Sequence, residues 1–360
     1  MADVIGFDNG SETWRVDQAV PATVGELLKN TDQEVVSGAA GSLRPIPTGF
    51  NPLDGILGGG VSRGDMMIIG GPQGVGKTIA SLQMARNMAA DARFPTLYVC
   101  YEHSRKHLLH RLLCLEVGAR AVPGQATPTL LKLNELMVAV AQHNQRANGG
   151  PRLAFREALR RDPLWAQALA AIESYAERLF LVKASSVTTT IGVLRRLAED
   201  VMHRTGSPIA LFVDYLQKVS IDPLSAQNEA EKTTILSEGL KDIAMTLEIP
   251  VIVLAAADRE GLKATRMRLH DLRGSSAIQY ESDVIIIFNN KYQIVSRNHI
   301  TYNPTQAQAF RNWVVFSIEK NRGGPAMVDL EFAIDPSHFR FSTQGGYVRE
   351  QLIDQRIVNE

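Results

Sequence analysis

The sequence has little cysteine, no excess of charge of either sign and no long apolar run. Its two cysteines, Cys100 and Cys114, each lie in an apolar stretch, which argues against a disulfide framework and indicates a reducing compartment. Lys and Arg together number 38, and so do Asp and Glu. The net charge therefore draws the chain neither to nucleic acid nor to an anionic membrane, and a polyanion would have to bind a local cluster.

Signals for secretion and for a membrane span are also missing. No apolar run reaches the ~18 residues that a transmembrane helix needs, and the sequence MADVIGFDNGSETW at the N-terminus lacks the basic and apolar regions of a signal peptide. We therefore expect a cytoplasmic protein without membrane contact. A chain of 360 residues allows one large α/β domain with an arm, or two modest domains.

The N-terminal part, residues 1–44, is predicted to be an arm and a linker helix. Thr23 and Glu26 fit a capping box at the start of an amphipathic helical pattern. A segment rich in Gly, Ser and Pro, SGAAGSLRPIPTG, then connects this helix to the rest of the chain. We assign residues 45–345 to one main domain and residues 346–360 to a polar tail.

The main domain alternates short apolar runs with long helical patterns. The runs MMIIG, TLYVCY, RLFLVK, IALFVDY, PVIVLA and DVIIIF are typical of parallel strands that are buried on both faces. Two later runs, WVVFSIEK and AMVDLEF, are separated by NRGGP, which predicts an antiparallel hairpin. The expected fold is α/β, with a mainly parallel, doubly wound sheet and an antiparallel hairpin at its edge.

A glycine-rich loop follows the first of these predicted strands. The sequence GGPQGVGKT satisfies G-x-x-x-x-G-K-[ST] between a strand and a helix. Main-chain N–H groups and the helix N-terminus would hold phosphates, Lys77 would reach the β and γ oxygens, and the Thr78 hydroxyl would coordinate Mg²⁺. The predicted site for ATP and Mg²⁺ comprises Gly71, Pro72, Gln73, Gly74, Val75, Gly76, Lys77 and Thr78.

Two carboxylates follow other predicted strands. Glu102 ends TLYVCYE and Asp214 ends IALFVD, and ligands of open parallel sheets bind at the carboxyl ends of strands. Asp214 can hold Mg²⁺ through its water shell, and Glu102 can polarise an attacking water. The alternative for each is a helix N-cap or a solvated turn.

These residues resemble the RecA-fold motor domain of the DnaB-type hexameric replicative helicases. The resemblance covers residues 22–342 and lies in IPTGFNPLD, GGPQGVGKT (Walker A), YEHS, VDYLQ (Walker B), LHDLRGSSAIQYESDVIIIF and IEKNRGGPAMVDLEF. It implies a RecA-like P-loop ATPase that forms a hexamer, uses Mg²⁺ and acts in DNA replication as a helicase on single-stranded DNA.

The resemblance also implies roles for single residues. Lys77 would bind phosphate, Glu102 would be the general base and Asp214 the Walker B acid. Lys320 and Arg322, two apart on a predicted strand and so on one side of it, would reach a nucleotide held by the neighbouring subunit. Active sites would then lie at the interfaces of a homo-oligomer. The alternative for this pair is a solvated hairpin edge.

A local basic cluster is present in DREGLKATRMRLHDLRGSS. Such a loop can line a central channel and bind the phosphates of single-stranded DNA with little sequence preference. The alternative is a solvated charged loop, because acidic residues dilute the charge. The candidate DNA-binding residues are Lys263, Arg266, Arg268 and Arg273, with Arg259 in the same stretch.

The chain departs from the family pattern at three places. Ala256 stands where the family generally has a glutamine that senses the γ-phosphate, and Gly274 stands where it has a glutamate after the loop arginine. About 45 residues precede the motor, so we expect the N-terminal collar domain to be missing. These departures keep open an alternative, namely a KaiC- or RadA-like ATPase that uses nucleotide state for assembly or partner binding without unwinding.

A stripe of histidines follows Glu102. His103, His107, His110 and Cys114 share one face of a predicted helix, a pattern that suggests a metal site. They span about 16 Å of helix axis, so at most an adjacent pair could share one ion. We prefer a partly buried helix face, with Cys114 acting as a small apolar residue.

Overall fold

The computed structural model describes residues 21–38, 44–122, 126–146, 150–222, 226–258, 261–295 and 308–353. Contacts divide the chain into two units, one ending at Leu43 and the other beginning at Arg44. Within the described ranges, no helix combines the length and the apolar character that crossing a bilayer requires.

The described part of the first unit contains helix α1, Val24–Val36. The predicted capping box is confirmed. The Thr23 hydroxyl accepts a hydrogen bond from the Glu26 N–H at 3.2 Å, and the Glu26 carboxylate accepts one from the Thr23 N–H at 2.7 Å. These bonds satisfy donors that the first turn of a helix otherwise leaves unpaired.

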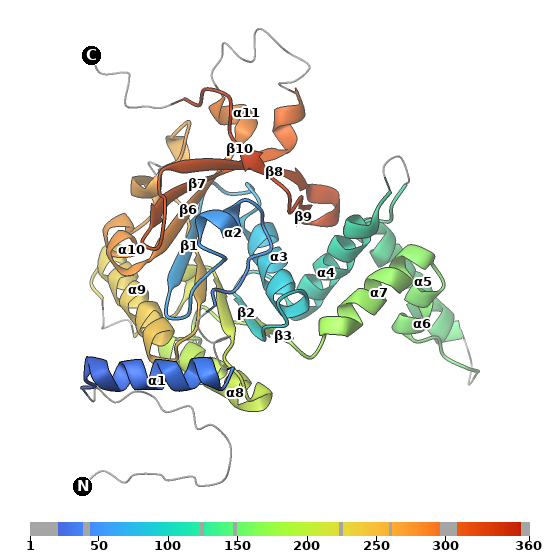
Figure 1. The fold of residues 1–360 in the computed structure, drawn as a ribbon. Coiled ribbons are helices and arrows are strands. Elements are labelled where there is room, and N and C mark those ends of the chain that lie inside the picture. The colour runs from blue at the N-terminus through green and yellow to red at the C-terminus, as the bar shows by residue number, and fades with distance from the viewer. Residues whose placement is uncertain are drawn as a thin grey trace. The chain divides into compact units, whose positions relative to one another are not determined.

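The second unit is built on one mixed sheet (Figure 1). Its strands lie in the order β10-β8-β7-β6-β1-β5-β4-β2-β3, with β9 paired to β8. The neighbours from β3 to β6 in this order pair in parallel, whereas β7, β8 and β10 continue the sheet in antiparallel fashion. The described strands are β1 Met66–Gly70, β2 Thr96–Cys100, β3 Leu179–Lys183, β4 Ala210–Asp214, β5 Val251–Leu254, β6 Val284–Asn290, β7 Trp313–Asn321, β8 Val328–Asp335, β9 Arg340–Phe341 and β10 Gly346–Tyr347.

The predicted fold class is confirmed strand by strand. The six apolar runs form β1 to β6, and the runs on either side of NRGGP form the antiparallel hairpin of β7 and β8. β1, β2, β4 and β5 are buried along their whole length. This is why these runs are continuously apolar and do not alternate with polar residues.

Helices cover both faces of the parallel strands (Figure 1). Along β1, Met67 and Ile69 join one apolar cluster, while Met66 and Ile68 join the other, because successive side chains of a strand point to opposite faces. The first face is covered by α3 Lys77–Ala90 and α4 Arg105–Arg120, and the second by α8 Ile191–Thr205, α9 Glu229–Thr246 and α10 Ser275–Glu281. Two short helices complete the set, α2 Leu53–Ile56 and α11 Lys291–Ile294.

Three more helices extend the molecule beside α4 (Figure 1). They are α5 Leu130–Arg146, α6 Phe155–Arg160 and α7 Pro163–Tyr175. Leu133 of α5 and Trp165 of α7 pack with Leu113 of α4 in a third apolar cluster. The extension thus has its own small core, which is continuous with the outer side of α4.

A buried carboxylate ties α4 to its neighbours. The Glu116 side chain is fully buried, and it forms ion pairs with Arg86 of α3 at 2.7 Å and with Arg120 at 2.6 Å. The Tyr175 hydroxyl donates a third hydrogen bond to it at 3.0 Å. Because both cations and the hydroxyl depend on one carboxylate, its removal would leave buried polar groups without partners.

We predict that Glu116→Ala lowers the free energy of unfolding by roughly 3–5 kcal/mol, the range for breaking a buried ion pair. Urea unfolding followed by circular dichroism measures the change. The matched control is Glu135→Ala, which removes only a surface pair with Lys132 on α5 and should cost less than about 1 kcal/mol. Equal losses in the two variants would contradict the role assigned to Glu116.

Candidate functional site

The glycine-rich loop lies between the end of β1 and the start of α3. Its conformation depends on glycine, since Gly71 has a φ of 146° and Gly76 a φ of 104°, where other residues are strained. Packing adds to this requirement. A Cβ at Gly71 would meet the Phe288 carbonyl oxygen at 2.7 Å, and one at Gly76 would meet the Phe341 ring at 2.9 Å.

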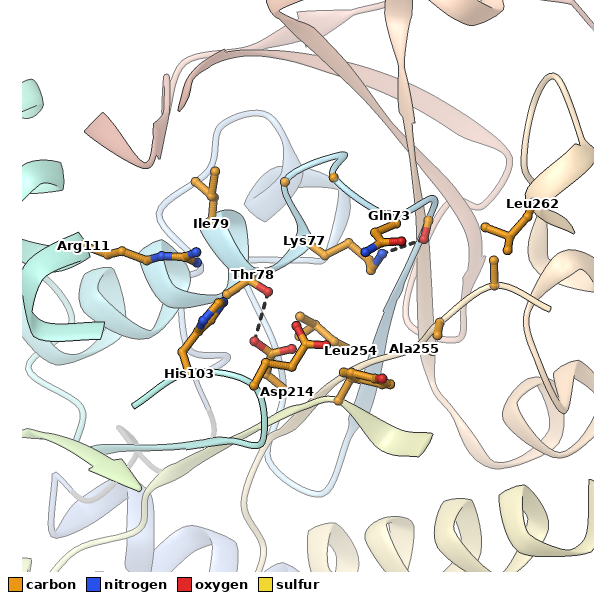
Figure 2. Close-up of a pocket in the computed structure, with 17 residues that line it drawn as sticks. Gln73, Lys77, Thr78, Ile79, His103, Arg111, Asp214, Leu254, Ala255 and Leu262 are labelled. Atoms are coloured by element: carbon orange, nitrogen blue, oxygen red, sulfur yellow. Dashed lines mark hydrogen bonds between the residues drawn. The ribbon is translucent and has the colours of Figure 1, made fainter. Parts of the chain in front are cut away.

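A buried carboxylate faces the loop from β4. Asp214 is 2% exposed, and its Oδ2 accepts hydrogen bonds from the Thr78 hydroxyl at 3.0 Å and from the Tyr98 hydroxyl at 3.1 Å. Figure 2 shows Thr78 and Asp214 pointing toward each other. Burial raises the pKa of the Asp214 carboxyl, and these two hydrogen bonds oppose that shift.

The Thr78 hydroxyl and the Asp214 carboxylate together fit a magnesium ion. Both offer oxygen ligands, which Mg²⁺ prefers, and the hydrogen bond between them places the two oxygens side by side. Among the described residues, no group of three His, Cys, Asp or Glu side chains forms a metal site. A metal at this place would therefore depend on phosphate or water oxygens to complete its coordination.

Lys77 closes the other side of the loop. Its ammonium donates hydrogen bonds to the carbonyl oxygens of Gly71 at 2.6 Å and Pro72 at 2.9 Å. Burial lowers the pKa of Lys77 to about 8, although the charges of Asp214 and Glu102 act in the opposite direction. The loop carbonyls thus hold a cation of reduced basicity at the start of α3.

These residues line a cavity of about 410 Å³ (Figure 2). Its size suits a small-molecule ligand. Of the residues predicted for the site, it brings together Gly71, Gln73, Gly74, Gly76, Lys77, Thr78, Glu102 and Asp214. Pro72 and Val75 do not line the cavity, and of these the Val75 side chain is 8% exposed. Glu102 is exposed, two residues after β2.

The histidine stripe contributes a second wall that the sequence did not predict. His103, just before α4, and Arg111 of α4 line the cavity, and the Arg111 Nε–H donates to His107 Nε2 at 3.0 Å. Burial and the nearby Arg111 lower the pKa of His103 to about 4. The signal was available in part, because positions 107 and 111 lie four apart and so on one helix face, whereas His103 lies before the helix begins at Arg105.

The other half of the stripe faces the interior. His110 is 7% exposed and Cys114 is fully buried, while His103 and His107 are half-buried. This is the partly buried helix face that we preferred from the sequence.

The predicted DNA-binding residues do not form one exposed cluster. Arg266 is 6% exposed, and its Nη2 donates to both carboxylate oxygens of Asp329 of β8, at 2.7 and 2.8 Å. Arg268 pairs with Glu319 of β7 at 3.0 Å. These two arginines thus fix the segment to the hairpin, which corrects the expectation that Arg266 faces a channel.

The remaining two candidates are more open to solvent. Lys263 lies in a 3₁₀ turn and is exposed. The Arg273 side chain is 42% exposed and forms an ion pair with Glu229 at 3.3 Å. Arg259 lies outside the described residues.

Lys320 and Arg322 both contact the C-terminal end of α10. The Lys320 ammonium donates to the carbonyl oxygens of Gln279 and Ser282, at 2.5 and 2.6 Å. The Arg322 guanidinium donates to the Tyr280 carbonyl and pairs with Asp283, both at 3.0 Å. β7 ends at Asn321, so the expectation that both lie on the strand is corrected for Arg322.

The strand pairing shows where Lys320 lies relative to the glycine-rich loop. Lys320 pairs with Ile285 at the beginning of β6, whereas the glycine-rich loop follows Gly70 at the end of β1, opposite Ile287 of β6. β1 and β6 are parallel, so through Ile285 the Lys320 residue is level with Ile68 in the middle of β1, two residues before the end of that strand. Neither Lys320 nor Arg322 lines the cavity at the loop.

Comparisons with known proteins agree with this geometry. A model of the DnaB-like helicase C-terminal domain matches residues 45–147 and 152–342. The replicative DNA helicase DnaB of Treponema pallidum is 27% identical over 321 residues, with 87% of this chain and 61% of that protein covered. The replicative DNA helicase DnaB of Geobacillus stearothermophilus is 26% identical over 322 residues, with 87% of this chain and 58% of that protein covered. The chain thus spans about three-fifths of these curated relatives.

Solved structures show the same fold. One solved ATPase domain matches with a TM-score of 0.66 at 20% identity, covering 89% of this chain and 99% of that one. A DnaB-like replicative helicase, solved for its interactions with primase, matches with a TM-score of 0.61 at 20% identity, covering 89% of this chain and 67% of that one. At this identity the likeness shows the fold, a RecA-type α/β domain.

The state of Lys77 predicts a pH dependence of nucleotide binding. A bound triphosphate would raise the pKa of Lys77 from its value of about 8, so binding is strongest below that pH and weakens as the pH rises through it. We expect the affinity for a nucleoside triphosphate to fall about tenfold between pH 7 and pH 9. Isothermal titration calorimetry measures both the affinity and the proton uptake.

The control is Lys77→Arg, because a guanidinium stays protonated throughout this range. Its affinity should be lower overall and nearly independent of pH between 7 and 9. An equally flat profile for the unmodified protein would contradict the assignment of Lys77 as the titrating phosphate ligand.

Proposed function

The chain belongs to the family of DnaB-like helicase C-terminal domains, and on this premise we propose that it is an ATP-hydrolysing ring motor that translocates on single-stranded DNA as a DnaB-like replicative helicase. The observation that carries the proposal is the pairing of Thr78 with Asp214 at the phosphate loop. The proposal places the protein in the cytoplasm, where DNA is replicated.

Each residue at the loop has a role in this proposal. The loop N–H groups and Lys77 bind the phosphates, and Lys77 exchanges the loop carbonyls for phosphate oxygens. Thr78 and Asp214 hold Mg²⁺, which neutralises charge on the β and γ phosphates. Glu102, exposed at the cavity, orients and deprotonates the attacking water.

Lys320 and Arg322 act on the nucleotide of a neighbouring subunit. This assignment is supported by the contacts of both side chains, which donate to carbonyl oxygens at the end of α10 and do not line the cavity at the phosphate loop of their own chain. Their contacts with α10 carbonyls are favourable charge interactions with a helix C-terminus. A homo-oligomeric ring, proposed as a hexamer, supplies the missing cations at every interface.

Exposed cations near the end of β5 bind the DNA backbone. Lys263 is exposed and the Arg273 side chain is 42% exposed, and we leave Arg266 and Arg268 out of the contact because their paired side chains are only 6% and 18% exposed. Phosphate contacts of this kind give an affinity that depends on salt and little on sequence. The KaiC- or RadA-like alternative is not favoured, since the matching model and the relatives are of the DnaB type.

We predict that single-stranded DNA raises the ATPase rate and that Arg273→Ala lowers this stimulation about tenfold or more, because loss of one phosphate contact weakens binding at every sequence. A coupled ATPase assay with a homopolymeric oligonucleotide measures it. The matched control is Arg156→Ala on α6, an exposed arginine far from this segment, which should behave as wild type. A rate indifferent to DNA would reject the motor.

Shared active sites predict complementation between two inactive variants. Lys77→Ala removes the phosphate ligand of one subunit and Arg322→Ala removes the cation given to the next, and each should lower turnover by about 10³-fold or more. After mixing in equal amounts and reassembly, about a quarter of the interfaces combine an intact loop with an intact cation, so about a quarter of the activity should return. Activity that stays at the level of the single variants would show that each chain completes its own site.

A further inference from the structure

The main chain of Ala256 is held from two sides at the wall of the cavity. Ala256 lies two residues after β5 and lines the cavity. Its N–H donates to Gln217 Oε1 at 3.1 Å, and its carbonyl oxygen accepts from the Arg273 N–H at 3.2 Å. One residue of the cavity wall therefore connects the turn after Asp214 with the segment that carries Arg273.

Within the described residues, the Gln217 amide accepts a hydrogen bond through its oxygen and makes none through its nitrogen. Gln217 lies in the 3₁₀ turn Leu216–Lys218, three residues after Asp214. Only its oxygen can accept from the Ala256 N–H, so the orientation of the amide is fixed. Its Nε2 is buried and has no hydrogen-bond partner among the described residues. A buried donor without a partner is unfavourable, so this amide is ready to take an acceptor in another state of the site.

The first turn of α9 contacts both Arg273 and Gln217. The Arg273 guanidinium pairs with Glu229 at 3.3 Å, and the Lys232 ammonium donates to the Gln217 main-chain oxygen at 3.2 Å. Glu229 and Lys232 are three apart and thus neighbours on the helix surface. Gln217, Ala256, Arg273 and α9 form a closed circuit of contacts, and a displacement at one member changes the others.

The end of β5 offers no side-chain route for this connection. Ala255, Ala256 and Ala257 all line the cavity, and a methyl group neither donates to phosphate nor accepts from a neighbouring chain segment. Nucleotide binding that draws the Thr78 hydroxyl away from Asp214 changes the end of β4 (Figure 2). That change reaches β5 and the Arg273 segment through the amide of Gln217.

Building on the proposed function, we propose that Gln217 is the positioning residue that couples the nucleotide state of the cavity to the DNA-contacting segment around Arg273. It acts through the Ala256 main chain and does not touch the reacting atoms. The Gln217 amide thereby provides a hydrogen-bonded link to this segment that the methyl side chain of Ala256 cannot provide.

Hydrogen–deuterium exchange of residues 261–278 tests the proposal without DNA. We expect the non-hydrolysable analogue AMP-PNP with Mg²⁺ to change exchange in this segment about three- to tenfold in the unmodified protein. Gln217→Met, similar in length but without an acceptor, should abolish the difference. Gln217→Glu keeps an oxygen for the Ala256 N–H and should retain at least about half of it.

The matched control is Gln167→Met, an exposed glutamine on α7, which should show the full difference. A segment that does not respond to AMP-PNP in the unmodified protein overturns the proposal, and so does a Gln217→Met variant that responds fully. If Gln217→Met does not fold, the proposal is still tested, because the response of the unmodified protein to AMP-PNP is measured without any variant. DNA-stimulated ATP hydrolysis is measured in a separate assay. The coupling through Gln217 can therefore be rejected while the proposed motor function is supported, and the motor function can be rejected while the coupling is supported.

Discussion

The hydrogen bond from Thr78 to the buried Asp214 carboxylate is the interaction on which the candidate site depends. It joins residues 136 positions apart in sequence, which meet because β1 and β4 both run parallel to β5 and end at the same edge of the sheet. Asp214 is almost without water, so Thr78 and Tyr98 supply its hydrogen bonds. Each such bond to a charged group contributes about 1.5–3 kcal/mol, enough to fix where a metal can be held.

The same sheet leaves the proposed cations, Lys320 and Arg322, outside the cavity of their own chain. Its strand ends gather the phosphate loop, Asp214 and Glu102, whereas the two cationic side chains donate to carbonyl oxygens at the end of α10 and do not line this cavity. In the proposed mechanism a neighbouring copy supplies the cations, so association of copies is part of that mechanism.

Local sequence patterns predicted the strands, the phosphate loop and the two carboxylates, because each of these depends on neighbours within a few positions. The partners of Arg266 and Arg268 could not be predicted in this way. Arg266 is neutralised by Asp329, 63 positions later, and Arg268 by Glu319. A count of the cations in a segment does not show which of them the fold pairs with distant carboxylates. The i, i+4 spacing of His103, His107 and Arg111, in contrast, can be read from the sequence.

Two of the departures from the family pattern, Ala256 and Gly274, lie next to Arg273, the proposed DNA contact. The Ala256 carbonyl accepts the Arg273 N–H, and Gly274 follows directly with a φ of 75°. A Cβ at Gly274 would meet Thr233 of α9 at 2.4 Å, so the close packing of α10 on α9 excludes a glutamate there. Main-chain contacts on both sides therefore position Arg273, and they need no long side chain at position 256 or 274.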